Sequence, residues 1–256
     1  MFDEAAVVAR VAATRFARVR YVIETASTND DAARELGSQA GHGSVLVAEH
    51  QTGGHGRRGR RWVSAPGSGL LFTVTLPEPI AASSLWAVPF WCALAVQEGA
   101  GRSSGALLDL QWPNDLLLGG RKVCGILSTS RVAGELAWVA CGIGINVRRP
   151  SADSSEVDPH AAYLSDIAPS VVREDVLVAI LRALDDAFGL LSDTSAVARA
   201  WEERARLRGT PYRILVDGDA EPFDARAVRL GVDGRLVVDV QGRERAISLA
   251  DARVVR

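Results

Sequence analysis

The chain has 256 residues, and its 29 Lys plus Arg against 31 Asp plus Glu leave a formal net charge of −2 at pH 7. Hydrophobic residues make up 48% and charged residues 23%, a composition typical of globular proteins that excludes extended disorder and collagen-like repetition. The near-neutral balance gives no overall positive field, so we expect neither DNA nor a membrane among the partners. At about 150 residues per domain, the length suits one large domain with a small companion.

The cysteines, the histidines and the apolar stretches indicate the compartment of the protein and whether it binds metal or spans a membrane. Cys92, Cys124 and Cys141 lie in apolar contexts without a CxxC pair, which predicts buried thiols in a reducing compartment. The four histidines have no metal-binding spacing, so we assign no metal ligand. The N-terminus carries acids where a signal peptide needs positive charge. The apolar part of the longest uncharged stretch, 85–96, is shorter than the roughly 20 residues of a spanning helix. We expect a soluble, cytoplasmic protein.

Hydrophobic periodicity predicts the elements of the first half in chain order. They are a helix at 3–18, a strand at 19–24, a short helix for which residues 27–31 offer N-cap side chains and which stops near Gly37, strands at 45–50 and 70–76, a buried helix at 84–98, and strands over LLDLQW, DLLL, KVCGILSTS and ELAWVACGIGINV. After a stretch rich in Ser, Asp and Pro at 150–159, two helices are expected around 177–191 and 195–207. This order predicts an α+β body.

The sequence pattern changes at Gly209 from helical periodicity to short strands. PYRILV, FDARAVRL, GRLVVDV and RAISL are short β-rich pieces separated by Gly and Asp turns. Four or five short strands in so few residues predict a small barrel. We therefore divide the chain into a catalytic domain at 1–208 and a C-terminal β domain at 209–256.

The most unusual segment is a loop rich in glycine and arginine, residues 53–62, between two predicted strands. It contains a formal G-x-G-x-x-G at 54–59, but a strand follows instead of the helix that dinucleotide binding needs. Arg57, Arg58, Arg60 and Arg61 are interleaved with glycine and followed by Trp62. Glycine lets the backbone approach a ligand closely, guanidinium groups bind phosphate or carboxylate oxygens in pairs, and the indole offers a flat surface, so the segment favours an anion-binding loop. The alternative is a solvated basic loop or a weak nucleic-acid patch.

Two further motifs carry charge or amide groups. Asp115 opens one predicted strand and Lys122 begins the next, so a tight turn at 119–120 brings the two side chains together. A lysine held there directs a compact positive charge at an oxyanion, or merely forms a hairpin ion pair. Asn146 follows the glycine-rich GIGI run, where its amide reads a base edge or caps a turn.

Four motifs occur in a fixed order: Ser27-Thr28-Asn29, GHGRRGRRW at 54–62, WPND at 112–115 with RKVCGIL at 121–127, and GIGIN at 142–146. Together they resemble the biotin protein ligases, or biotin–acetyl-CoA-carboxylase ligases, over roughly residues 20–150. The resemblance implies a central mixed or antiparallel sheet flanked by helices, as in biotin and lipoate ligases, with a small C-terminal SH3-like barrel. It also implies the monofunctional class, because about 20 residues before the first strand are too few for a DNA-binding domain.

The activity that the resemblance implies has two steps. Biotin and ATP, with Mg²⁺, form biotinyl-5′-AMP and pyrophosphate, and a lysine of a biotin carboxyl carrier domain of an acyl-CoA carboxylase then attacks the acyl-adenylate. The alternatives are a lipoate or octanoate ligase or transferase of the same superfamily, and a non-catalytic biotin-binding module.

The resemblance also assigns site residues. Those implied for biotin are Ser27, Thr28, Asn29, Gln51, His55, Gly56, Arg57 and Lys122, with Gln51 beside the ureido ring. Those implied for the nucleotide are Arg58, Arg60, Trp62 and Asn146. Those implied for catalysis are Lys122, Arg57 and Asp115, where Asp115 orients Lys122 or the incoming amine.

Two positions depart from the family pattern. His55 stands where the family usually has arginine, so we expect only its main chain to serve the ligand. Gln111 stands where the family usually has lysine, which removes one positive charge near the site.

Overall fold

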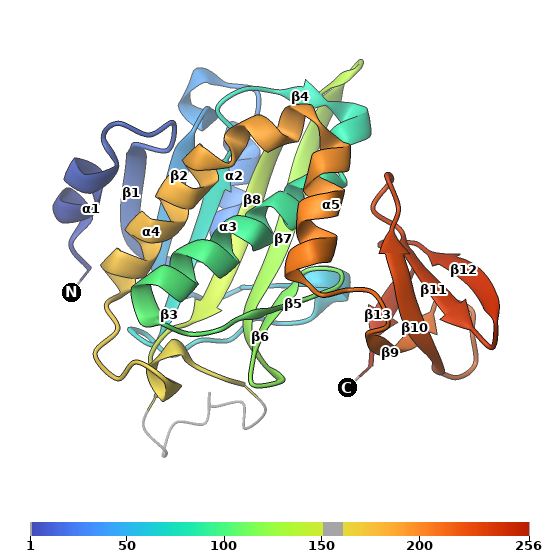
Figure 1. The fold of residues 1–256 in the computed structure, drawn as a ribbon. Coiled ribbons are helices and arrows are strands. Elements are labelled where there is room, and N and C mark those ends of the chain that lie inside the picture. The colour runs from blue at the N-terminus through green and yellow to red at the C-terminus, as the bar shows by residue number, and fades with distance from the viewer. Residues whose placement is uncertain (1, 151–160, 256) are drawn as a thin grey trace.

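The computed structural model describes residues 2–150 and 161–255. The stretch rich in Ser, Asp and Pro at 150–159 therefore lies outside the described residues, except for Pro150. His160 also lies outside them. Two β-sheets make up the molecule, a large one wrapped by helices and a small one at the C-terminus (Figure 1).

The large sheet has eight strands in the order β1-β2-β3-β8-β7-β6-β5, and β4 pairs with β8. Their bounds are β1 Arg18–Thr25, β2 Ser44–Gln51, β3 Gly69–Thr75, β4 Ile80–Ala81, β5 Asp109–Gln111, β6 Asp115–Leu118, β7 Arg121–Ala133 and β8 Leu136–Asn146. β1 and β2 are parallel, whereas every other pair is antiparallel. The predicted mixed sheet is confirmed, and β4 is an addition that the sequence patterns did not indicate.

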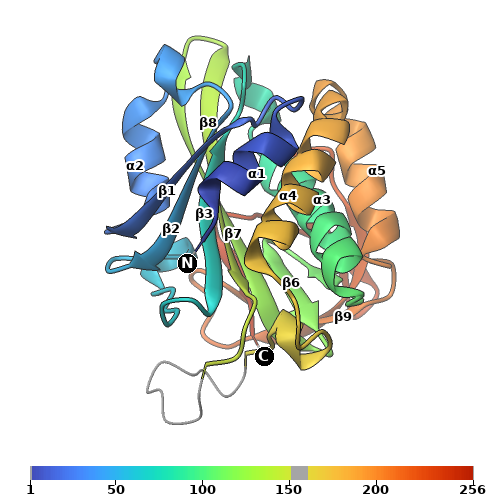
Figure 2. The same cartoon turned by 90° about the vertical axis from the view of Figure 1, so that its left-hand side faces the viewer.

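Helices cover the two faces of this sheet unequally. α1, Glu4–Val11, α3, Ala87–Ser104, α4, Arg173–Asp186, and α5, Thr194–Arg204, lie on one face, and α2, Thr28–Glu35, lies on the other (Figure 2). α3 packs closely on α4, because a Cβ on Gly99 would lie 2.5 Å from the backbone nitrogen of Ile180. Pro89 stands in the first turn of α3, where its missing N–H leaves no hydrogen bond unmade.

The first helix is shorter than predicted. The pattern indicated a helix to residue 18, but α1 ends at Val11. Beyond it, the side chain of Thr14 accepts a hydrogen bond from the backbone of Phe16, and Asp185 of α4 accepts one from the backbone of Arg15. These partners replace helical hydrogen bonds and turn Phe16 fully into the core. None of the described helices has the length and apolarity to cross a membrane.

A half-buried ion pair joins α4 to β2, and the same arginine reaches the start of β3. Arg173 donates to both carboxylate oxygens of Glu49 at 3.0 Å and to the carbonyl of Gly69 at 3.2 Å, and Tyr21 donates to Glu49 at 2.6 Å. Burial raises the pKa of Glu49, but the hydrogen bonds from Arg173 and Tyr21 outweigh it and leave the pKa below its ordinary value. Burial and the bond to Glu49 raise the pKa of Tyr21 to about 12.

The three cysteines are free and buried, as predicted. Burial raises the pKa of the Cys92 and Cys124 thiols. Both are therefore thiols at neutral pH and behave as small apolar side chains.

The small sheet has five antiparallel strands in the order β12-β11-β10-β9-β13, compatible with the predicted SH3-like barrel. The strands are β9 Pro211–Val216, β10 Phe223–Leu230, β11 Leu236–Val240, β12 Arg243–Ile247 and β13 Ala252–Val254. The division predicted at 208–209 falls between the end of α5 and the start of β9. That division stays a prediction.

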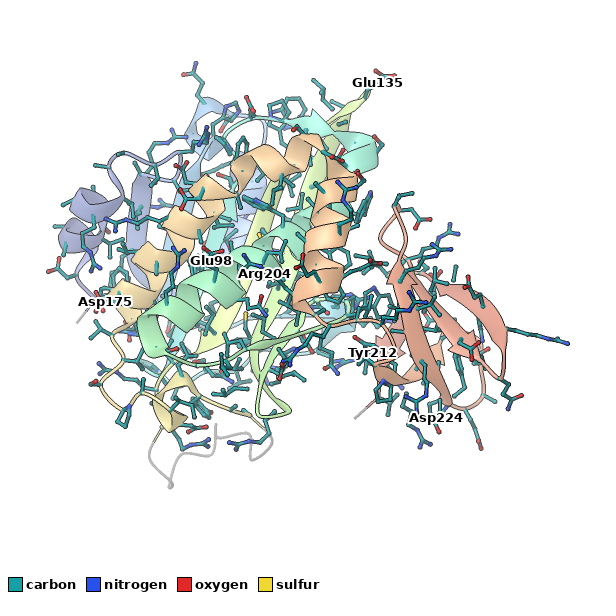
Figure 3. All side chains as sticks on the ribbon, viewed as in Figure 1. Glu98, Glu135, Asp175, Arg204, Tyr212 and Asp224 are labelled. Carbon is teal, nitrogen blue, oxygen red and sulfur yellow. The ribbon has the colours of Figure 1, made fainter. Side chains whose placement is uncertain are left out.

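The two sheets meet at the tryptophan of the WPND motif. Trp112 is fully buried; its backbone N–H donates to the hydroxyl of Tyr212 and its indole N–H to the carbonyl of Gly234, both at 3.4 Å. Figure 3 shows Tyr212 at this junction. The small sheet is therefore fastened directly to one of the four motifs.

Candidate active site

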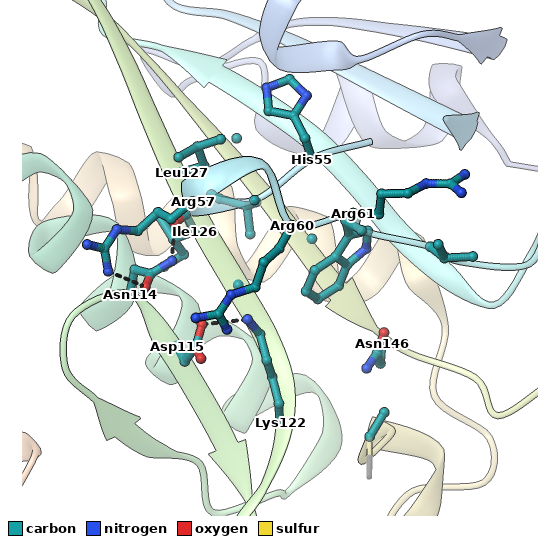
Figure 4. A pocket seen from close by; sticks show the side chains of 18 of the residues that line it. His55, Arg57, Arg60, Arg61, Asn114, Asp115, Lys122, Ile126, Leu127 and Asn146 are labelled. Atoms are coloured by element: carbon teal, nitrogen blue, oxygen red, sulfur yellow. Dashed lines mark hydrogen bonds and ion pairs between the residues drawn. The ribbon is translucent and has the colours of Figure 1, made fainter. Parts of the chain in front are cut away.

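A cavity of about 820 Å³ opens on the face of the large sheet where α2 lies. Its volume falls within the roughly 300–1,000 Å³ of small-molecule pockets. Figure 4 shows the close view. Every residue that the sequence predicted for the site lines this cavity: Ser27, Thr28, Asn29, Gln51, His55, Gly56, Arg57, Arg58, Arg60, Trp62, Asp115, Lys122 and Asn146.

The start of α2 forms one wall. Ser27 caps the helix by accepting a hydrogen bond from the backbone of Asp30. The backbone and hydroxyl of Thr28 donate to the side-chain oxygen of Gln51 at 2.7 and 3.0 Å, and Thr73 donates to Thr28 at 2.8 Å. Because its oxygen is engaged, Gln51 presents its amide nitrogen to a ligand.

Asn29, the third residue of the STN motif, is only 7% exposed. Its side-chain oxygen is buried and has no hydrogen-bond partner. Buried polar atoms are nearly always paired, so an unpaired acceptor on a cavity wall indicates a ligand that donates a hydrogen bond.

Glycines form the floor of the cavity. Gly125 of β7 pairs with Gly144 of β8, and Gly142 lies two residues before Gly144 on the same strand. A Cβ on Gly144 would lie 2.7 Å from the Trp62 ring, one on Gly125 3.0 Å from it, and one on Gly142 3.1 Å from the Asn29 side chain. We call these three residues the glycine floor. Sequence reasoning singled out only Asn146 in the GIGIN motif; alternation along a strand that carries glycine on one face was the available signal.

Trp62 covers the glycine floor from above. Its indole nitrogen is buried without a hydrogen-bond partner, and the Lys122 ammonium nitrogen is 5.4 Å from the ring centroid. An indole with a free donor, beside a cation, provides a flat surface and a hydrogen bond for a ring-shaped ligand.

The predicted pairing of Asp115 with Lys122 is confirmed. The β6–β7 hairpin brings the ammonium nitrogen to 2.6 Å from the carboxylate, with both side chains half-buried or more. In Figure 4 the Arg60 side chain points toward this pair. The geometry satisfies the hairpin ion pair and also directs one positive charge into the cavity.

The glycine–arginine loop, residues 53–62, contacts the small sheet. Arg57 donates to the carbonyls of Leu249 and Ala252 and, at 3.4 Å, to the side chain of Asn114. Burial lowers the pKa of Arg57, as does the adjacent guanidinium of Arg58. Arg57 thus bridges the loop, the WPND motif and the small sheet, a position that the sequence did not predict.

Arg58 is engaged in the same way. Its guanidinium donates to both oxygens of Asp217 at 2.8 and 2.7 Å and to the carbonyl of Ala250 at 3.1 Å. The predicted nucleotide residue therefore holds the small sheet in this conformation, although it also lines the cavity.

The main chain at Gly56 is also used within the loop. Its N–H donates to the carbonyl of Arg60 at 2.6 Å, and His55 bonds through its ring to the carbonyl of Gly53 at 3.2 Å. The Gly56 N–H, which the resemblance assigns to the ligand, is occupied in this conformation.

Several lining residues escaped sequence reasoning. Asn114 bonds the carbonyl of Ile126 at 2.8 Å, while Arg121, Tyr163 and Arg253 come from a hairpin, a loop and the small sheet. Local patterns carry no signal for the last three, because only tertiary packing brings them together. Within the described residues, no group of three or more His, Cys, Asp and Glu side chains has the arrangement of a metal site.

Comparisons with known proteins agree with the geometry. The profile of the Biotin/lipoate A/B protein ligase family matches residues 21–146. The chain is 30% identical over 244 residues to the biotin–[acetyl-CoA-carboxylase] ligase of Mycobacterium tuberculosis, covering 90% of this chain and 86% of that one. It is 33% identical over 219 residues to the ligase of the same name from Paracoccus denitrificans, covering 77% and 84%.

A solved structure shares the fold. The biotin protein ligase from Aquifex aeolicus in complex with biotin and ATP superimposes with a TM-score of 0.72 at 22% identity, covering 93% of this chain and 99% of that one. The chain belongs to the biotin/lipoate protein ligase family, and the relatives that establish this are biotin–[acetyl-CoA-carboxylase] ligases.

Proposed function

We propose that this chain is a biotin–protein ligase. It activates biotin with ATP to biotinyl-5′-AMP, releasing pyrophosphate, and transfers the biotinyl group to a lysine of a biotin carboxyl carrier domain of an acyl-CoA carboxylase. The observation that carries the proposal is that four motifs far apart in the chain meet in one cavity, which the unpaired oxygen of Asn29 and the ammonium group of Lys122 both line. The relatives named above support it.

The α2 end of the cavity suits the ureido ring of biotin. That ring has two N–H donors and one carbonyl acceptor. The free oxygen of Asn29 accepts a hydrogen bond there, and the amide nitrogen of Gln51 donates one. Ser27 and Thr28 hold these groups in place through the helix cap and the bond to Gln51.

Lys122 lies where charge develops. In the first step a carboxylate oxygen of biotin attacks the α-phosphorus of ATP, a new O–P bond forms, and the bond to pyrophosphate breaks. A fixed ammonium stabilises the shared negative charge, and Asp115 at 2.6 Å orients it. In the second step the carrier amine attacks the acyl carbonyl and AMP leaves. Asp115 is the carboxylate among the described lining residues that is placed to assist that amine.

The loop and the end of β8 serve the nucleotide. Trp62 offers a ring surface and Asn146 an amide, while Arg57, Arg58 and Arg60 provide positive charge for phosphates. Main-chain groups of His55 and Gly56, together with Arg57, line the biotin and the adenylate phosphate. Mg²⁺ enters as part of the nucleotide substrate, since magnesium is commonly held by substrate phosphates with one or two carboxylates, and Asp115 is the carboxylate at hand.

The division into a catalytic domain at 1–208 and a C-terminal domain at 209–256 belongs to this proposal, as does the cytoplasmic location. The fastening of Trp112 to Tyr212 and Gly234 makes the small sheet part of the working enzyme.

A biotin-dependent exchange of labelled pyrophosphate into ATP tests the proposal, because only reversible adenylation produces it. We expect exchange with biotin and none with lipoate or octanoate. Exchange with lipoate alone would favour the lipoate ligase alternative. Biotin binding in calorimetry without any exchange would favour the non-catalytic module.

A further inference from the structure

A bidentate ion pair between Arg58 and Asp217 links the loop to the small sheet. Two parallel N–H···O bonds of 2.8 and 2.7 Å join residues separated by 159 positions in the chain. Such a fork-to-fork pair fixes the orientation of both groups, because neither side chain can rotate without losing a bond. Asp217 does not line the cavity.

The backbone at Arg58 needs a partner of this kind. Arg58 has φ 60° and ψ 34°, the left-handed conformation, and Gly59 follows with φ 69°. A side chain other than glycine is crowded there, so the conformation persists only where surrounding contacts hold it. The hydrogen bonds that Arg58 donates to Asp217 and to the carbonyl of Ala250 supply those contacts.

The neighbouring residue depends on the same turn. Arg57 reaches the carbonyls of Leu249 and Ala252 and the side chain of Asn114, so its guanidinium lies beside the WPND motif. If the turn at 57–59 relaxes, Arg57 loses its place beside the WPND motif and Arg60 loses its orientation toward the Asp115–Lys122 pair.

We propose that Asp217 is a positioning residue for the nucleotide end of the site, acting through Arg58. This inference rests on the proposed function for its kinetic part. The part of the biotin site formed by α2 and Gln51 makes its hydrogen bonds to the large sheet, so we expect the affinity for biotin to depend on Asp217 far less than the affinity for ATP does. The carboxylate is 63% exposed, which limits the size of the effect.

Limited trypsin digestion tests the structural part without any activity. Four of the loop residues are arginines, so the loop carries its own cleavage sites. Asp217→Asn keeps the shape and removes the charge. We expect cleavage within 57–61 to be about fivefold faster, because proteolysis follows the population of the open loop. Unchanged cleavage would overturn the proposal.

Steady-state pyrophosphate exchange tests the kinetic part. We expect the KM for ATP to rise about three- to tenfold in Asp217→Asn with a much smaller rise in the KM for biotin, and Asp217→Glu to restore most of the loss. An equal rise for both substrates, or an unchanged KM for ATP, would overturn the positioning role.

The matched control is Asp219→Asn, two residues further on, whose carboxylate pairs with Arg245 within the small sheet at 3.3 Å. It should change neither cleavage nor the KM for ATP. Wild-type protein without exchange activity would refute the proposed function, whereas normal exchange with unchanged loop cleavage in Asp217→Asn would refute only this inference.

Discussion

The two faces of the large sheet differ in the side chains that β8 places on them: large apolar ones on the helix-covered face and glycines on the face that lines the cavity. Ile143 and Ile145 point into the helix-covered core and are at most 2% exposed. Gly142 and Gly144, which alternate with them along the strand, face α2 and Trp62, and Asn146 ends the strand in the cavity. One strand thus supplies packing on one side and empty space on the other. The contrast teaches that stability and ligand binding are separable here, residue by residue.

Glycine weakens a strand for two reasons: it loses more backbone conformational entropy on folding than other residues, and it has no side chain to pack. β8 tolerates two of them because it is central, with β3 and β7 bonded along both edges. The helix-covered face supplies the apolar burial that an open face lacks.

The largest effect is expected on the open face at Lys122. Lys122→Ala removes the charge that stabilises the adenylation step, so the rate of pyrophosphate exchange should fall about 10²–10³-fold. Lys122→Arg is the control that retains a cation. Near wild-type exchange in the alanine variant would reduce Lys122 to a hairpin ion-pair partner.

Adjacent positions of β8 test the contrast directly. Ile143→Ala should lower the free energy of unfolding by about 2–4 kcal/mol in urea titrations and leave kcat unchanged well below the unfolding midpoint. Gly144→Ala adds a methyl 2.7 Å from the Trp62 ring and should raise the KM for ATP about tenfold with little loss of stability. The same outcome for both variants would break the comparison.

Asn29 gives a smaller effect on the same face. Its buried oxygen has no partner in the protein, so Asn29→Ala removes no intramolecular bond from that atom and should leave thermal stability near that of the wild type. Biotin affinity measured by calorimetry should weaken about tenfold. A destabilised variant with normal biotin affinity would show that the side chain serves the fold instead.

Glu49 does not line the cavity, so the effect expected there is on stability and not on ligand binding. Because the folded-state pKa of Glu49 is lowered, its ionised form adds stability above the unfolded pKa of about 4.3, and that stability is lost as the pH falls through the folded value. Glu49→Gln should lose about 1–3 kcal/mol of unfolding free energy at pH 7. The difference from wild type should shrink in urea titrations below about pH 4. An equal difference at both pH values would count against the ion pair.

Local patterns predicted much of the fold, and the family resemblance assigned the residues of the site. The strands, the Ser27 cap and the Asp115–Lys122 hairpin depend on residues close in sequence. The end of α1 and the position of Arg58 do not, because their partners Asp185 and Asp217 lie 170 and 159 residues away. The roles assigned to the site residues stay predictions.

Lys122 is the one lysine among the 29 basic residues of the chain. An acyl-adenylate is an electrophile that reacts with any unprotonated amine it meets, and here the single side-chain amine is bound to a carboxylate 2.6 Å away. An activated acid that escapes the cavity therefore finds no other lysine on the protein to modify. For the same reason, an amine-selective reagent has Lys122 as its one side-chain target, so the cavity of the wild-type protein can be labelled without introducing a new residue.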